Sequence, residues 1–118
     1  MKRVKRTERG WAGHFCLAQR CLFRRNTLLE CGKEKVVVST VGLLYNRETN
    51  EIEKIGSDGY YECMVFPAIK KGNYWDADWS KTLESETITF FNEGSDQKAN
   101  EMHEDMIKKF TDKMKKGE

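Results

Sequence analysis

The residues best suited to chemistry are a group of arginines near the N-terminus, interleaved with aromatic side chains. Arg20, Arg24, Arg25 and Asn26 lie close together in the sequence, and His14 precedes them. A guanidinium group is planar and permanently charged, and it matches the oxygens of a phosphate in bidentate geometry. Several arginines beside flat rings predict a site for a phosphorylated ligand that carries a base. A solvated strand face with salt bridges contains the same residue types, so both interpretations stay open.

Arg24 and Arg25 occupy adjacent positions in a segment that reads as extended chain. Successive side chains of a β-strand point to opposite faces of the sheet. Only one of the two should therefore read phosphate in a given pocket, with Arg20 as the alternate.

A second group of residues suited to ligand binding is aromatic and lies in the later part of the chain. Its members are Tyr60, Tyr61, Tyr74, Trp75 and Trp79, with Asp76 and Asp78 among them. Such rings can stack on a purine while a carboxylate or amide reads its edge, although aromatic residues near sheet ends more often pack in the core. We select Trp75 for stacking, Tyr60 as second choice, and Asn92 as a polar reader at the end of the last strand.

The chain lacks the common sequence signatures of nucleotide-binding loops, serine hydrolases and zinc proteases. His14 and His103 fall on different predicted elements, and we expect His103 on the surface of a helix. No pair of residues is nominated as acid and base. The sequence therefore predicts a binding protein, with no catalytic residues and no cofactor.

Metal binding is the weaker interpretation of the cysteines, which are Cys16, Cys21, Cys31 and Cys63. No two of them have the C-x-x-C spacing that brings two thiolates to one zinc ion. We expect free, buried thiols, and a mixed site of His14 and Cys16 is the alternative.

Composition limits the size of the core and the cellular setting. Of the 118 residues, 38% are apolar and 34% are charged, so a thin core and a gain from self-association are expected. The uncharged run after Lys35 contains Ser39, Thr40 and Gly42 and is too short to span a bilayer. The N-terminus continues into charged residues instead of an apolar signal region, which predicts a cytoplasmic protein.

The net charge of +2 conceals an uneven distribution. Residues 1–25 hold eight Lys or Arg and one acidic residue, Glu8, whereas residues 26–118 hold 13 basic and 18 acidic residues. This asymmetry indicates either an anion site in the N-terminal part or head-to-tail neutralisation between subunits.

The elements that must position these residues are strands followed by a helix. Extended segments are predicted at residues 13–17, 21–24, 27–31, 35–44, 51–55, 60–66 and 86–91. The β-branched run at 35–44 predicts a central strand, Pro67 is expected to end its strand, and residues 57–59 predict a turn. We therefore predict one domain over 1–118, of the α+β class, with an antiparallel meander sheet over about 10–91.

A long amphipathic helix is predicted over about residues 97–115, because its apolar residues recur at spacings of three and four. They are Ala99, Met102, Met106, Ile107, Phe110 and Met114. This stripe should pack on the sheet, or partly against a second subunit.

Four segments carry a resemblance to a known family: RTERGWAGHF at 6–15, CLFRRNTLL at 21–29, VVSTVG at 37–42 and IGSDGYYE at 55–62. In these the chain resembles the first family of Thoeris anti-defence proteins, made by phages and prophages. The resemblance covers about the first eighty residues. It implies a homo-oligomer with pockets at subunit interfaces, which captures cyclic ADP-ribose isomers and related cyclic nucleotides without cleaving them, in the cytoplasm of the bacterial host.

The alternative is a phage inhibitor directed at nucleic acid or a nucleoprotein complex, using the basic residues 2–25. It predicts binding that weakens by orders of magnitude with rising salt. The acidic balance of residues 26–118 argues against nucleic acid as the partner.

Overall fold

The computed structural model describes residues 3–11, 13–15, 17–55 and 59–116. Its elements are β1 (Lys5–Arg9), the 3₁₀ helix η1 (Ala18–Arg20), β2 (Cys21–Cys31), β3 (Glu34–Asn46), β4 (Glu51–Glu53), β5 (Tyr61–Lys71), β6 (Tyr74–Ala77), β7 (Glu84–Ile88) and α1 (Ser95–Lys116). The antiparallel sheet followed by one C-terminal helix confirms the predicted α+β class. The sheet begins at Lys5, earlier than the expected residue 10.

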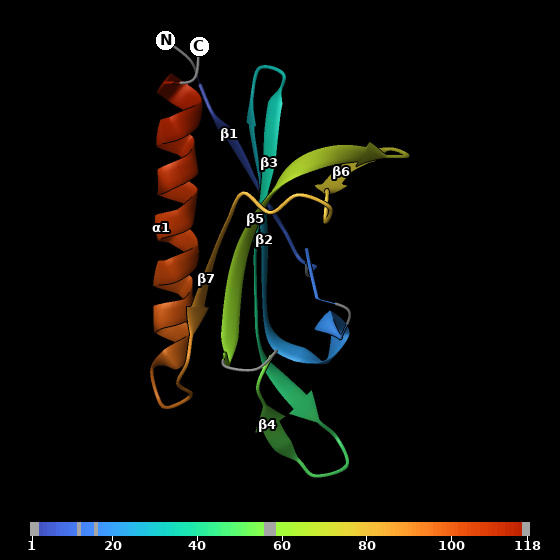
Figure 1. Ribbon diagram of the computed structural model, residues 1–118, viewed down its shortest axis with the longest axis vertical. Helices are drawn as coiled ribbons and strands as arrows, with labels where there is room; N and C mark the ends of the chain where they lie inside the picture. The colour runs from blue at the N-terminus through green and yellow to red at the C-terminus, as the bar shows by residue number, and fades with distance from the viewer. Residues whose placement is uncertain (1–2, 12, 16, 56–58, 117–118) are drawn as a thin grey trace.

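The sheet is a meander in which β1, β2, β3 and β5 lie side by side, and every pair of neighbouring strands is antiparallel. The short strand β4 pairs with the end of β3, while β7 and β6 pair with successive parts of β5. In Figure 1 α1 runs along one side of the sheet, and β6 lies on the other side. The molecule is elongated, with extents of 50 × 30 × 21 Å.

Three strands predicted near the N-terminus, at residues 13–17, 21–24 and 27–31, differ from the structure. Residues 13–15 form no strand, because Phe15 has a left-handed backbone (φ 79°) and the chain turns into η1. Residues 21–24 and 27–31 belong to one strand, β2, since it pairs continuously with β3 from Phe23 onward. The loop before η1 is therefore free to cross the face of the sheet, which positions His14.

Pro67 does not end its strand, contrary to expectation, because β5 continues to Lys71. It pairs with Val36 at the last position that β5 shares with β3. On the other edge, β5 changes partner near this residue, from β7 to β6. The Pro67 carbonyl still accepts a hydrogen bond from the Asp78 amide at 2.8 Å, so the missing N–H falls where the ladder is already interrupted.

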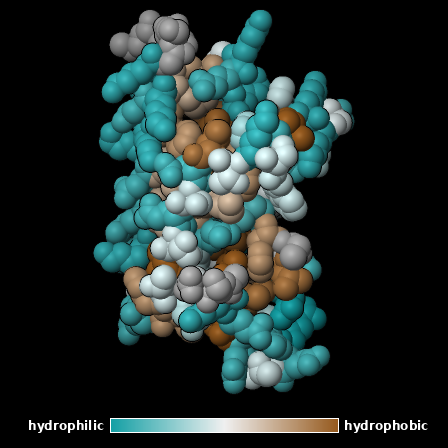
Figure 2. Space-filling view, in the orientation of Figure 1, coloured by the Kyte–Doolittle hydropathy of each residue, from teal (hydrophilic) through white to brown (hydrophobic). Residues whose placement is uncertain are grey.

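The helix buries its whole apolar stripe against its own sheet. The buried side chains are Ala99, Met102, Met106, Ile107, Phe110 and Met114, and they join residues of β2, β3, β5 and β7 in one core. In the space-filling view the outer surface of α1 is hydrophilic (Figure 2). The stripe is thus used within one chain, and self-association would need other surfaces.

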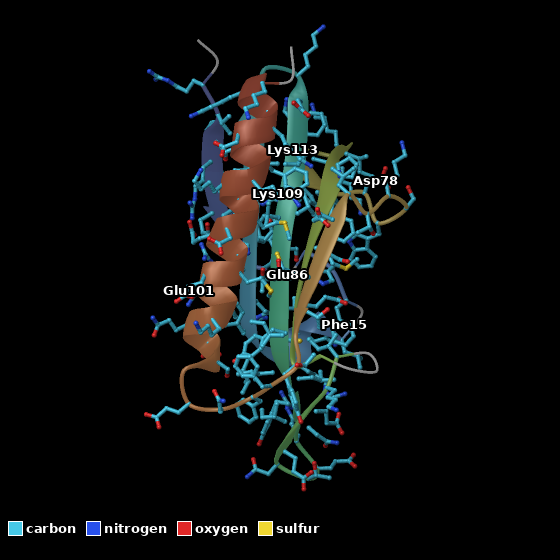
Figure 3. All side chains as sticks on the ribbon, turned by 60° about the vertical axis from the view of Figure 1, so that its left-hand side comes forward. Phe15, Asp78, Glu86, Glu101, Lys109 and Lys113 are labelled. Atoms are coloured by element: carbon cyan, nitrogen blue, oxygen red, sulfur yellow. The ribbon has the colours of Figure 1, made fainter. Side chains whose placement is uncertain are left out.

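Polar contacts tie α1 to the sheet at its start and further along its length. At its start, the Tyr61 hydroxyl lies 2.8 Å from Ser95 Oγ and donates to Asp96, and burial together with Asp96 raises the pKa of Tyr61 to about 12. Further along, Lys109 Nζ donates a hydrogen bond to Glu84 on β7. Phe15 lies on the side of the sheet away from the helix (Figure 3). Within the described residues, no helix is long and apolar enough to cross a bilayer.

Other predictions concern the last strand, the cysteines and one turn. The last strand is β7, which ends at Ile88 and leaves Phe90 and Phe91 exposed in the following loop. Three free cysteines are buried as expected, at positions 21, 31 and 63. The predicted turn at 57–59 and the thiol of Cys16 fall largely outside the described residues.

Candidate functional site

A groove of about 380 Å³ opens where β2 begins, and three arginines approach it from different elements. Arg20 ends η1, Arg24 lies on β2, and Arg47 lies in the β3–β4 hairpin loop. The full lining is Gln19, Arg20, Cys21, Leu22, Arg24, Tyr45 and Arg47. We call this hollow the arginine groove. A neighbouring hollow of about 370 Å³ shares Arg20 and Arg47 with it.

The hairpin that carries Arg47 is shaped by local backbone chemistry. Leu43 has a left-handed backbone (φ 56°), which a branched side chain adopts only under strain, and it bends the end of β3. Asn46 Oδ1 then accepts the amides of Glu48 at 2.9 Å and Thr49 at 3.3 Å, forming an Asx turn. The bend and the turn together bring Arg47 alongside Arg20.

The charge of the arginine groove is only partly neutralised. Arg20 donates from Nε to the Tyr45 carbonyl at 3.2 Å, and its guanidinium lies 3.8 Å from Glu53. Among the described residues, no carboxylate forms a salt bridge with Arg24 or Arg47. Three guanidinium groups around one hollow can bind several anionic oxygens at once. The groove therefore suits a ligand with more than one phosphate oxygen.

Arg25 points to the opposite face, as the alternation of a strand requires. Its guanidinium lies 2.9 Å from both Glu8 and Glu104, so it links β2 to β1 and α1. Arg6 donates to the same Glu104, and these hydrogen bonds lower the pKa of Glu104 to about 2. Arg25 thus holds the helix on the sheet, whereas Arg24 faces the groove.

His103 is fully buried, so the expectation of a surface position is wrong. Its ring nitrogens lie 2.8 Å from Thr27 Oγ1 and 2.7 Å from Thr40 Oγ1. Burial, helped by the positive charge of Arg25, lowers the pKa of His103 to about 4. A ring enclosed in this way serves the packing of α1 on the sheet and has no route to a ligand.

His14 is held on the other face of the sheet, in the loop after β1. Its ring bonds to Ser39 Oγ at 2.8 Å and to Glu62 Oε1 at 3.0 Å, and the Gly13 amide donates to the same Ser39 hydroxyl. Serine, histidine and carboxylate in contact are the components of a hydrolytic triad. Here Ser39 is fully buried and His14 only 4% exposed, so the group fastens the loop to β3 and β5.

Asn26 is also buried, directly beneath this loop. Its Oδ1 accepts two bonds from Arg9, at 3.0 and 2.9 Å, and its Nδ2 has no partner among the described residues. The prediction placed Asn26 with the phosphate-reading arginines. The structure instead places it as the support of Arg9.

The predicted aromatic readers do not converge with the arginines within one chain. Trp75 packs on a small apolar cluster that includes Phe66, and Lys35 Nζ lies 4.8 Å from the centre of its ring. Tyr60 contacts Phe91, with ring centres 5.8 Å apart. Asn92 precedes α1, and its carbonyl accepts the Ser95 hydroxyl. Of the eight predicted site residues, only Arg20 and Arg24 line the arginine groove.

Arg47 and Tyr45 also line the groove and were not among the predicted site residues, although both lie at or beside the predicted hairpin loop. Their position at the end of the strongest strand could have indicated them, because the end of β3 pairs with the start of β2 near Arg20.

Comparisons with models of protein families, with curated proteins and with solved structures find no match to this chain.

Proposed function

We propose that the protein binds a cyclic nucleotide immune signal, of the cyclic ADP-ribose isomer type, and sequesters it without cleavage. The observation that carries this proposal is the arrangement of Arg20, Arg24 and Arg47 around one groove. Their charge suits a pyrophosphate, and the resemblance to Thoeris anti-defence proteins supplies the identity of the ligand. The setting we propose is the cytoplasm of an infected or lysogenic bacterium.

The distribution of ion pairs supports the choice of this groove. Three arginines of β1 and β2 are engaged within the fold, since Arg6 and Arg25 pair with Glu104 and Arg9 bonds to Asn26. The N-terminal charge excess is thus partly neutralised by α1. What remains available near η1 is the charge of Arg24 and Arg47.

Binding without cleavage agrees with the state of the reactive side chains. Ser39 is enclosed and its hydroxyl already has two partners. Cys21 lines the groove, but burial raises the pKa of its thiol to about 11, against the influence of Arg24 and Arg20. A thiol with this pKa is almost wholly protonated at neutral pH and is a poor nucleophile.

A homo-oligomer with pockets at subunit interfaces remains part of the proposal. Leu22 lines the arginine groove and is 63% exposed, so a large apolar side chain lies beside the arginines of the groove. A second subunit that covered Leu22 would enclose the ligand and exclude water from the arginines.

The second candidate, an inhibitor directed at nucleic acid, uses the same arginines on phosphates. The ion pairs that Arg6 and Arg25 form with Glu104 disfavour it, because they neutralise part of the basic surface that would contact the phosphates. Binding to a duplex should fall steeply between low and moderate salt, whereas a small enclosed ligand should respond much less.

The test is to incubate the purified protein with a panel of cyclic nucleotides that includes cyclic ADP-ribose isomers, remove unbound ligand, heat the protein, and analyse the release by mass spectrometry. Intact ligand is expected, in proportion to the protein. Arg20→Ala combined with Arg24→Ala should abolish the release. Arg3→Ala is the control, since Arg3 precedes β1, and the start of β1 lies at the end of the molecule opposite β4 (Figure 1). A product of altered mass would indicate an enzyme, and release that is unchanged in the double variant would place the ligand elsewhere.

A further inference from the structure

A separate hollow of about 500 Å³ lies beside β6 and is lined by Trp11, Tyr74 and Asp76. We call these three residues the aromatic shelf. The two rings are 43% and 48% exposed, stand almost perpendicular to each other at 81°, and have centres 6.2 Å apart. Large aromatic side chains that remain this accessible around a hollow are available to contact a ligand.

The position of Trp11 is fixed by a buried support. Arg9 donates to Asn26 Oδ1, at 3.0 and 2.9 Å, and to the Trp75 carbonyl. Its guanidinium carbon lies 4.7 Å from the centre of the Trp11 ring. Because Asn26 is fully buried in β2, the stack of Arg9 on Trp11 is anchored to the sheet. A ring held in place before binding loses little conformational freedom when a ligand arrives.

The charges around the aromatic shelf indicate which ligands fit. Among the described residues, Asp76 is the one acidic residue that lines the shelf. Lys71 Nζ lies 3.9 Å from Asp76 Oδ2, and the Arg9 guanidinium lies beside the shelf on the Trp11 ring. Two cations near one carboxylate disfavour a positively charged ligand, although two rings and a carboxylate can otherwise enclose one. Within the described part of the chain, Asp76 Oδ1 accepts one hydrogen bond, from the Ala77 amide at 2.8 Å, so the carboxylate keeps acceptor sites for a neutral N–H donor.

We propose that the aromatic shelf binds an uncharged heteroaromatic ring with an amino group, which is the chemistry of a nucleobase. The ring packs against Trp11 and Tyr74, and its amino group donates to Asp76. The shelf shares no lining residue with the arginine groove, so this binding requires no phosphate and goes beyond the function proposed above. This site also differs from the one expected from the sequence, where the base stacks on Trp75. The exposed ring of β6 belongs to its neighbour, Tyr74.

The test uses adenosine, a nucleoside without phosphate, titrated into the protein while the indole N–H signals of the tryptophans are followed by NMR. The signal of Trp11, assigned with Trp11→Phe, should shift on binding. Tyr74→Ala should weaken binding about tenfold, within the range measured for stacking of one base. Phe90→Ala, which removes an aromatic ring of similar exposure from the loop after β7, should leave the affinity unchanged.

Two further measurements examine the hydrogen bond and the charge preference. Asp76→Asn should weaken binding of adenosine but change little for purine riboside, which lacks the amino group. Choline serves as the cationic probe and should bind more weakly than adenosine. The proposal is overturned if saturating adenosine leaves the Trp11 signal in place, if Tyr74→Ala binds as the wild type does, or if choline binds more tightly. Because no probe carries a phosphate, none of these outcomes depends on the arginine groove.

Discussion

Acidification should destabilise this fold through His103, well before most carboxylates are protonated. The ring is buried between Thr27 and Thr40, and its pKa is lowered from 6.5 to about 4. As the pH falls below 6.5, His103 therefore becomes protonated in the unfolded chain while it stays neutral in the folded chain. The contribution of the neutral His103 ring to the free energy of unfolding is fully present above pH 6.5 and is lost as the pH falls toward 4. At 1.36 kcal/mol per pKa unit, the loss between pH 7 and pH 4.5 is about 2 kcal/mol.

Urea unfolding followed by circular dichroism, at several pH values from 7 to 4.5, measures this loss directly. The charged groups that face His103 are Arg6, Glu8, Arg25 and Glu104. The arginines stay charged throughout, and the pKa values of both glutamates are lowered in the fold, so their contribution is lost mainly below this range. His103→Gln keeps a donor and an acceptor for the two threonines but cannot titrate. If this variant and the wild type lose the same free energy of unfolding, the reasoning about His103 is refuted.

Three further predictions concern the loop, the edge strand and assembly. Gly13→Ala should destabilise the fold by about 1 to 3 kcal/mol in urea unfolding, because a Cβ there would lie 2.8 Å from Ser39 Cβ, whereas Gly10→Ala, with nothing within 4 Å, should be nearly neutral. Trp75→Ala should lower the melting temperature, because Trp75 packs on the cluster of β3 and β5; a folded variant of unchanged stability that no longer binds ligand would instead support the stacking role first assigned to it. Light scattering in moderate salt should give at least a dimer mass, and a monomer at high micromolar concentration would contradict assembly.

The sequence was most informative where one physical signal dominates. The apolar spacing of three and four located α1 to within two residues at each end, because a helix on a sheet must bury one face. The valines of β3 likewise identified the central strand, which is covered on both faces. The alternation of side chains also separated Arg24 from Arg25, and the structure places Arg25 against α1.

The rest depends on contacts between distant segments, which local pattern does not contain. His103 looks like a surface histidine until Thr27 and Thr40 are brought beneath it by the pairing of β2 with β3. The loop of His14 reads as a strand because its residue types suit one, yet the bond to Ser39 and the left-handed backbone of Phe15 direct it across the sheet. Arg47 joins the arginine groove only because the hairpin folds back toward η1.

We propose that the arginine groove binds a phosphate-bearing cyclic nucleotide, and isothermal titration calorimetry can measure this binding. A panel of cyclic ADP-ribose isomers is titrated into the wild type and into Arg24→Ala. We predict sub-micromolar affinity for at least one isomer, corresponding to about −8 kcal/mol or stronger, and a loss of at least about tenfold in the variant. Equal affinity in both proteins, or no heat from any isomer with the wild type, would contradict the claim.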